Sequence, residues 1–275
     1  MIQLRLRDLL ALGLLVFAAS AAHAADDGKF VVSAGVDYTS GKYGTDTSTD
    51  IWDVPFGFGY AAGPWSFKLT VPYVSISGAS NVIPGIGQVQ NTNPRGRGRG
   101  RGGVPTPPST VTTGSASGLG DVVAQATLQA YTDAAAQFGV DVTGKVKFGT
   151  ADENKGLGTG KNDYGLNVDL YKGFGAWTVF GGVGYTRYGS SDFIPLNNGW
   201  NANLGTGYKL DEADNIGVYY YYREKISDAG FRQSEATAYW NHRIGDAWAV
   251  QAYVLGGFAD GSPDWGAGAN VKYTF

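Results

Sequence analysis

Few side chains in this sequence are suited to catalysis, and they are widely spaced. His242 is the one histidine beyond residue 24, and Asn241 and Arg243 flank it. A nucleophile–base pair needs a serine or cysteine within hydrogen-bond reach of the histidine, and this segment offers none. His242 lies beside the turn at Gly245-Asp246, on the apolar face of a predicted strand, so we interpret it as an interfacial side chain. The sequence therefore predicts that the protein is not an enzyme.

The segment 156–161 has the composition of a phosphate-binding loop but lacks its spacing. Lys155 stands where the first glycine should be, and Asn162 follows the lysine where serine or threonine is needed. The nearby Asp152 and Glu153 could touch a divalent cation, but two adjacent carboxylates are weak evidence for a site. The sequence contains no cysteine, so a Cys/His metal centre is not expected. We predict no cofactor and no metal.

An Arg-Gly repeat flanked by prolines is the least ordinary feature; its arginines are Arg95, Arg97, Arg99 and Arg101. The simplest interpretation is a flexible, solvated low-complexity insertion. A functional alternative is contact with the phosphates of surface lipopolysaccharide, which arginine binds well. Arg-Gly repeats also bind nucleic acid. However, the chain beyond residue 24 has 19 basic and 23 acidic residues, and this weak negative charge argues against a nucleic-acid partner.

The first 24 residues have the pattern of a cleaved secretory signal. Two arginines precede the apolar run 9–19, and Ala22-His23-Ala24 supplies a small-x-small cleavage site. A retained membrane anchor is the alternative, but the apolar run is too short to cross a bilayer comfortably. We therefore expect a signal peptide at 1–24 and one folded domain at 25–275.

Twelve segments after the leader alternate between apolar and polar residues with a period of two, which is typical of strands with one apolar face. In one of them, for example, Phe67 and Leu69 enclose Lys68. The predicted strands are 29–38, 50–61, 65–77, 120–131, 137–149, 163–173, 176–188, 198–210, 215–225, 233–244, 247–259 and 264–275. An even number of strands puts both termini at the same end of a closed barrel. The pattern predicts an all-β, antiparallel, up-and-down transmembrane barrel of the outer-membrane type.

The predicted connections alternate between short and long. Ala62-Gly63-Pro64 and Gly245-Asp246 are short turns, whereas 78–119 is the longest connection. Outer-membrane barrels combine short periplasmic turns with longer extracellular loops, and a soluble β-sandwich has no reason to sort its connections in this way. We therefore predict a location in the cell outer membrane, both termini in the periplasm, and a long extracellular loop at 78–119.

Aromatic residues gather near the ends of the apolar faces, as at Trp52, Trp177 and Trp248. Tryptophan and tyrosine favour a membrane–water interface because one part of the ring is apolar and another hydrogen-bonds. The terminal Phe275 resembles the aromatic signal that outer-membrane proteins present to the barrel assembly machinery. The expected partners are outer-membrane lipid, lipopolysaccharide, that machinery and a small solute.

The same alternation assigns ionisable and aromatic side chains to the lumen. Seven inward positive charges against six negative ones predict little ion selectivity, although structural ion pairs that fill a narrow barrel explain them equally well. Twelve strands lie between filled barrels of about eight and open pores of about sixteen, so we expect a narrow path; Tyr131 is one of its inward aromatics. The predicted path residues are Lys68, Asp121, Asp141, Lys145, Lys147, Asp169, Lys209, Tyr219, Tyr221, Arg223 and Glu235.

Several glycine-rich segments resemble those of one family; they are Gly118-Leu-Gly-Asp121, residues 145–150, residues 155–163 and residues 177–185. They are similar to the outer-membrane transporter family named for the meta-pathway of phenol degradation. The similarity covers 118–188 well and the rest loosely, and Gly149-Thr150-Ala151-Asp152 replaces the Pro-Thr-Gly-Asp of the family. The resemblance implies a barrel that passes small aromatic or hydrophobic compounds across the outer membrane.

These observations leave three hypotheses in order of preference. The first is a channel for passive uptake of small, aromatic or hydrophobic solutes. The second is a structural or adhesive surface barrel that acts through its Arg-Gly loop. An outer-membrane enzyme is the third and least favoured.

Overall fold

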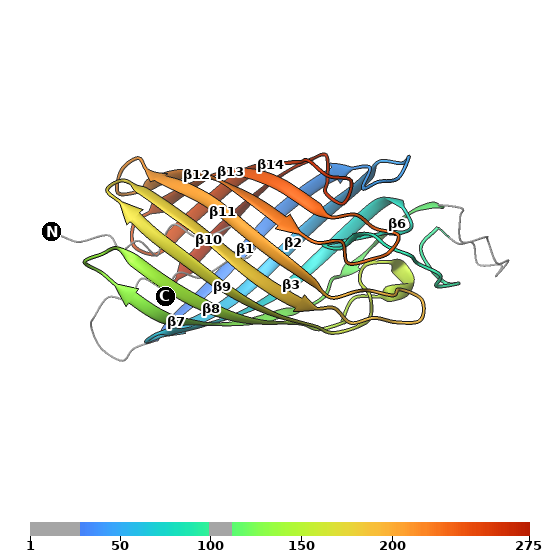
Figure 1. The fold of residues 1–275 in the computed structure, drawn as a ribbon, viewed down its shortest axis with the longest axis horizontal. Helices are drawn as coiled ribbons and strands as arrows, with labels where there is room; N and C mark the ends of the chain where they lie inside the picture. The colour runs from blue at the N-terminus through green and yellow to red at the C-terminus, as the bar shows by residue number, and fades with distance from the viewer. Residues whose placement is uncertain (1–27, 99–111) are drawn as a thin grey trace.

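The computed structural model describes residues 28–98 and 112–275, which form a closed antiparallel β-barrel (Figure 1). The predicted signal peptide lies outside the described residues. The wall strands are β1 (Lys29–Gly41), β2 (Thr49–Ala62), β3 (Trp65–Ala79), β6 (Thr113–Leu119), β7 (Val123–Asp133), β8 (Phe138–Lys147), β9 (Asp163–Phe174), β10 (Trp177–Arg187), β11 (Gly199–Lys209), β12 (Asp214–Arg223), β13 (Gln233–Ile244), β14 (Trp248–Gly257) and β15 (Trp265–Thr274). The barrel closes because β1 pairs with β15 and β2 pairs with β3. Since β6 and β7 both pair with β3 and are halves of one interrupted strand, the prediction of twelve strands is confirmed.

The two faces of the wall differ in polarity because successive side chains of a strand point to opposite sides. In β9, Leu166, Val168 and Leu170 are exposed, whereas Asn167 and Asp169 between them are partly buried on the inside. Large exposed apolar side chains recur in this way around the barrel. A surface of this kind is stable where lipid covers it, as on the outer wall of a membrane barrel.

Aromatic pairs on neighbouring strands mark the two edges of this apolar surface. Trp177 and Tyr208 have ring centroids 4.8 Å apart, and Tyr185 and Trp200 have centroids 5.0 Å apart. Both pairs join β10 to β11, one near each end of the strands. Their positions are those expected for the two interfacial belts of a membrane barrel.

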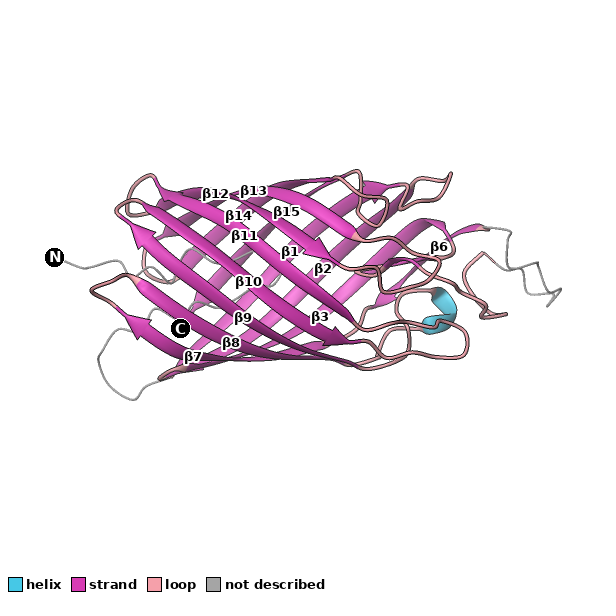
Figure 2. Ribbon diagram, in the orientation of Figure 1, coloured by secondary structure: helices cyan, strands magenta, loops and turns pink. Residues whose placement is uncertain are grey.

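Short turns join the strands at one end, the turn end, and long loops join them at the other, the loop end (Figure 2). The first strand starts at the turn end, and the last residue, Phe275, lies there too, since Val31 pairs with Thr274. The strands cross the wall obliquely (Figure 1). Among the described residues, no helix is long and apolar enough to span a membrane.

The connection predicted at 78–119 is shorter than expected, because β3 extends to Ala79 and residues 113–119 form β6 beside it. The alternation is hard to recognise in β6, since its residues are mostly Thr, Gly, Ser and Ala. The break between β6 and β7 lies opposite Pro72, which has no N–H to donate to a neighbouring strand. The N–H of Gly120 donates to the carbonyl oxygen of Pro72 at 2.9 Å. A methyl group at Gly120 would lie 2.8 Å from Pro72 Cγ. The chain therefore needs glycine where it passes Pro72 between β6 and β7.

A second irregularity reverses one predicted orientation. The register of β7 against β8 shifts between Gln129 and Tyr131, which is the signature of a β-bulge. The extra residue moves Tyr131 to the outer face, where it is 52% exposed and its ring lies 6.0 Å from that of Phe138. The prediction that Tyr131 faces the lumen is therefore wrong, because a strict period of two does not survive a bulge.

Candidate solute path through the barrel

The charged side chains predicted to line the lumen occupy inward-facing positions of the wall. Lys68, for example, is 7% exposed between the exposed Phe67 and Leu69. Lys68 and Lys145 both pair in register with Gln125, so polar side chains follow one another across three neighbouring strands. The other predicted path residues that lie inward in the same alternation are Asp141, Lys147, Asp169, Lys209, Tyr219, Tyr221, Arg223 and Glu235. Asp121 lies at the break between β6 and β7 and also turns inward, to Lys147.

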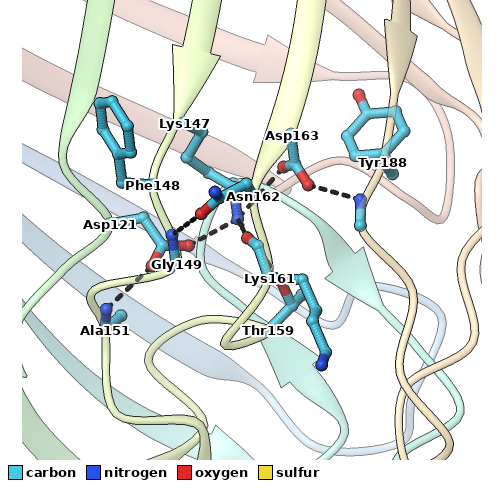
Figure 3. A network of polar contacts seen from close by, with 12 residues as sticks. Asp121, Lys147, Phe148, Gly149, Ala151, Thr159, Lys161, Asn162, Asp163 and Tyr188 are labelled. Carbon is cyan, nitrogen blue, oxygen red and sulfur yellow. Dashed lines mark hydrogen bonds and ion pairs between the residues drawn. The ribbon is translucent and has the colours of Figure 1, made fainter.

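Lys147 at the end of β8 is the centre of an ion network (Figure 3). Its Nζ lies 2.6 Å from Oδ2 of Asp121 and 3.1 Å from Oδ2 of Asp163. The other oxygens of the two carboxylates accept the backbone N–H groups of Ala151 and Gly189, each from a different loop. Lys147 is thus a structural cation that ties two loops to the wall, and the sequence did not identify Asp163 as its second partner.

Aromatic side chains form an arc on the inner wall from β9 to β14. Tyr171, Phe180 and Tyr239 belong to one buried cluster, with Tyr219 and Tyr253 packed against it. Tyr171 pairs in register with Phe180, and Tyr239 with Tyr253. The three clustered side chains are only 4% to 5% exposed. The inner wall is therefore covered by closely packed aromatic side chains along this arc.

A hairpin formed by β4 (Val82–Ile83) and β5 (Gly87–Gln88) reaches across the loop end. The carbonyl oxygens of Gly85 and Ile86 at its tip accept hydrogen bonds from Nη1 and Nη2 of Arg223 at 3.0 and 2.6 Å. Arg223 ends β12, which in the strand order is equally far from β3 in both directions around the barrel. The hairpin therefore joins opposite walls and covers the loop end of the lumen.

Two apolar clusters anchor this cover. Val82 packs in one cluster with Ile76 of the wall, and Ile83 packs in another with Ile194 and Ile226 from loops on the far side. Val82 and Ile83 are completely buried. Each fully buried side chain of this size contributes roughly 1.5–3 kcal/mol, so the loop end holds a small apolar core of its own.

Arg97 is buried inside the cover. Its Nη1 donates to the carbonyl oxygen of Gly156 at 3.4 Å, and its Nη2 donates to the carbonyl oxygens of Val82, at 3.1 Å, and of Ala79. Burial lowers the pKa of Arg97 to about 10, which leaves the guanidinium charged at neutral pH. The predicted contact of Arg97 with lipopolysaccharide is therefore wrong, because the residue is only 5% exposed and both of its Nη atoms donate to carbonyl oxygens inside the loop end. Of the other arginines in the repeat, Arg95 is exposed, and Arg99 and Arg101 lie outside the described residues.

His242 lies on the outer face near the turn end. Its Nδ1 is 2.9 Å from Oδ1 of Asp214, the residue opposite it in register on β12. The same oxygen accepts a hydrogen bond from Nε1 of Trp240 at 2.7 Å, and the Trp240 and His242 rings stack at 5.6 Å. These are the contacts of an interfacial polar cluster. The sequence did not reveal Asp214 as the partner because it belongs to another strand.

The acidic pair in the loop after β8 has a local structural role. Asp152 caps a short 3-10 helix (Glu153–Lys155) by accepting the N–H groups of Asn154 and Lys155. Within the residues that the structure describes, no group of three or more His, Cys, Asp or Glu side chains is arranged to hold a metal ion.

The closed barrel, its lipid-compatible surface and its inward polar and aromatic side chains define an outer-membrane β-barrel. The chain belongs to the family described as "Putative MetA-pathway of phenol degradation", whose model matches residues 27–275. The resemblance found in the sequence is thus confirmed. No curated protein sequence is significantly similar to the chain.

One solved structure with a TM-score above 0.5 supports the fold. The COG4313 outer membrane channel from Pseudomonas putida F1 superposes with a TM-score of 0.67 at 13% identity, over 92% of this chain and 97% of that one. The β domain of the Bordetella autotransporter BrkA has a TM-score of 0.47 at 14% identity, over 90% and 99% of the two chains. The P. putida toluene transporter TodX has a TM-score of 0.44 at 11% identity, over 91% and 90%.

Proposed function

We propose that this protein is a passive outer-membrane channel for small aromatic solutes, with a covered entrance at its loop end. The observation that carries the proposal is the aromatic arc on the inner wall. A planar apolar solute can contact the partly exposed rings of the arc, Tyr219 and Tyr253, which pack against the buried rings. A lumen lined by polar side chains alone would give such a solute no advantage over water.

Three further observations support the proposal. The description of the family refers to phenol degradation, and the solved structure with a TM-score of 0.67 is described as an outer membrane channel. The inner wall also carries lysines and carboxylates in similar number, and a wall without one dominant sign selects weakly among ions. Uncharged aromatic solutes are therefore the class that we assign.

The orientation and the partners follow the usual plan of outer-membrane barrels. We place the turn end and both termini in the periplasm and the loop end outside the cell. Phe275 is 69% exposed, which suits recognition by the assembly machinery, and the exposed Arg95 is placed to meet lipopolysaccharide phosphates. We assign no nucleic-acid partner and no cofactor. We also assign no catalytic role, and we interpret His242, which contacts Asp214 on the outer face, as an interfacial side chain.

Transport by the reconstituted barrel tests the proposal. In planar bilayers the protein is expected to conduct ions, and vesicles that contain it are expected to swell faster in phenyl glucoside than in cyclohexyl glucoside. The two solutes have similar size, and only the first has an aromatic ring. Equal swelling rates would contradict the aromatic preference. The absence of both conductance and swelling would overturn the proposal that the protein is a channel.

The adhesive alternative has lost support. It relied on an exposed array of arginines, but Arg97 is buried beneath the loop. Replacing Arg95 by alanine is expected to leave both transport and folding unchanged, since surface substitutions usually alter stability by no more than about 0.5 kcal/mol. Binding of lipopolysaccharide micelles, measured for the wild type and Arg95→Ala, tests the remaining surface contact separately.

A further inference from the structure

We infer that glycines of the inner wall fix the width of the solute path, because they leave room for the aromatic rings of the arc to lie against the wall. The inference rests on the proposed function and identifies the residues that determine its selectivity. Four rings of the arc each cover a glycine of a neighbouring strand, and we call each such ring and its glycine a ring–glycine pair. The four ring–glycine pairs are Tyr171 with Gly139, Phe180 with Gly205, Tyr239 with Gly217 and Tyr253 with Gly268.

Close approach is the reason for glycine at these positions. A methyl group built at Gly139, Gly205 or Gly217 would lie 2.2, 2.5 or 2.4 Å from Cζ of its partner ring, far inside van der Waals contact. None of the four glycines is among the glycines with a positive φ, so the backbone conformation does not require them. Glycine weakens the interior of a strand, so its presence there often marks a place where another group approaches the backbone closely. At Gly139 and Gly217 the partner ring supplies the nearest atoms. At Gly205 Cβ of Tyr219 lies as near as the Phe180 ring, and at Gly268 Oδ1 of Asp37 lies nearer than the Tyr253 ring.

Two of the rings are also fixed at their far ends. The Tyr171 ring of β9 crosses Gly139 of β8, and its hydroxyl accepts a hydrogen bond from Nε2 of Gln129 on β7 at 2.9 Å. The Tyr253 ring of β14 crosses Gly268 of β15 in the same way, and its hydroxyl donates to Oδ1 of Asp37 on β1 at 2.6 Å.

These contacts keep the rings against the wall. Each of the two tyrosines spans three neighbouring strands: the strand that carries it, the strand of the glycine, and the strand of the hydrogen-bond partner. A side chain in place of the glycine would occupy the space of the ring, and the backbone of the wall blocks displacement outward. The ring would have to move toward the axis and narrow the path. The glycines therefore determine how much of the lumen the aromatic arc leaves open.

Gly139 and Tyr171 are the best pair for a test. The three atoms nearest to a methyl group at Gly139 all belong to Tyr171, whereas a methyl group at Gly217 would also lie 2.5 Å from the backbone oxygen of Thr206. Gly144, in the same strand, has no atom within 4 Å of such a methyl group and is exposed on the outer face. It provides a matched control with the same substitution in β8.

The experiment compares wild type, Gly139→Ala, Tyr171→Ala, the double variant and Gly144→Ala in planar bilayers. Gly139→Ala is expected to lower the single-channel conductance about twofold or more, and Tyr171→Ala to raise it, because the aromatic arc and the covered loop end are constrictions in series and each adds to the resistance of the path. The double variant should match Tyr171→Ala, since the methyl group then has no ring to displace. Gly144→Ala should match the wild type.

Nitration with tetranitromethane, mapped by mass spectrometry, gives a readout that needs no transport. Tyr171 is 4% exposed and should react slowly in the wild type and in Gly144→Ala, but rapidly in Gly139→Ala. Heat-modifiable migration in gels verifies that each variant is folded, and if Gly139→Ala alone fails to fold, recovery of folding in the double variant supports the pair. Unchanged conductance and unchanged nitration in a folded Gly139→Ala barrel would overturn the inference. A wild type that conducts nothing would overturn the proposed function instead.

Discussion

Replacing Arg223 by alanine is expected to release the hairpin from the loop end and to raise the single-channel conductance severalfold. The guanidinium holds the carbonyl oxygens of Gly85 and Ile86 at the hairpin tip. Hydrogen bonds that involve a charged group contribute roughly 1.5–3 kcal/mol each. If the two hydrogen bonds together stabilise the docked hairpin by about 3 kcal/mol, their loss raises the equilibrium constant for release of the hairpin from the loop end by about two orders of magnitude. The side chain is 4% exposed, so water does not replace these bonds in the native arrangement.

Single-channel recording in planar bilayers measures this effect, and two variants accompany it. Arg223→Lys should give an intermediate conductance, because an ammonium group is a point charge and lacks the planar fork that reaches both oxygens. Arg232→Ala removes an exposed arginine from a neighbouring loop at the same end and should leave the conductance unchanged. If folded Arg223→Ala barrels conduct like the wild type, the prediction is wrong: either the hairpin does not limit the entrance, or the apolar contacts of Val82 and Ile83 hold it in place without Arg223.

Replacing Lys147 by alanine is expected to destabilise the barrel by about 3–5 kcal/mol, the usual cost of removing one partner from a buried ion pair. The side chain of Lys147 is 17% exposed, and those of Asp121 and Asp163 are 10% and 6% exposed. Without the ammonium group two carboxylates would face each other inside the wall. The loops that hydrogen-bond to them through Ala151 and Gly189 should loosen first.

Equilibrium unfolding in urea, with the barrel in lipid vesicles, measures this free energy. Lys161→Ala removes an exposed lysine of the loop that joins β8 to β9 and should change the free energy by less than about 0.5 kcal/mol. The triple variant Lys147→Ala/Asp121→Asn/Asp163→Asn should recover part of the loss, because the uncompensated charges are then gone. Equal stability of Lys147→Ala and Lys161→Ala would show that the network contributes nothing to the fold.

The wall of the barrel could be predicted from the sequence because its information is local. Alternation with period two assigns each side chain to one face, so the inward positions of Lys68, Asp141 and Tyr219 followed without knowledge of strand pairing. The sorting of connections by length likewise predicted which ends of the strands lie together. The same local rule was wrong for Tyr131, where a bulge inserts one residue, and it missed β6, whose small residues show little alternation.

The path through the barrel required the tertiary structure. Arg223 meets the hairpin tip, and Lys147 meets Asp163, only because closure of the barrel brings distant segments together. The sequence shows where glycines and aromatic residues occur. Which of them pair depends on which strands are neighbours and on the register between those strands. The sequence by itself therefore determined a membrane barrel with a polar and aromatic interior, because the period of a strand is set within a few residues. How that interior is narrowed and covered was decided by contacts between strands and loops, whose partners no local pattern specifies.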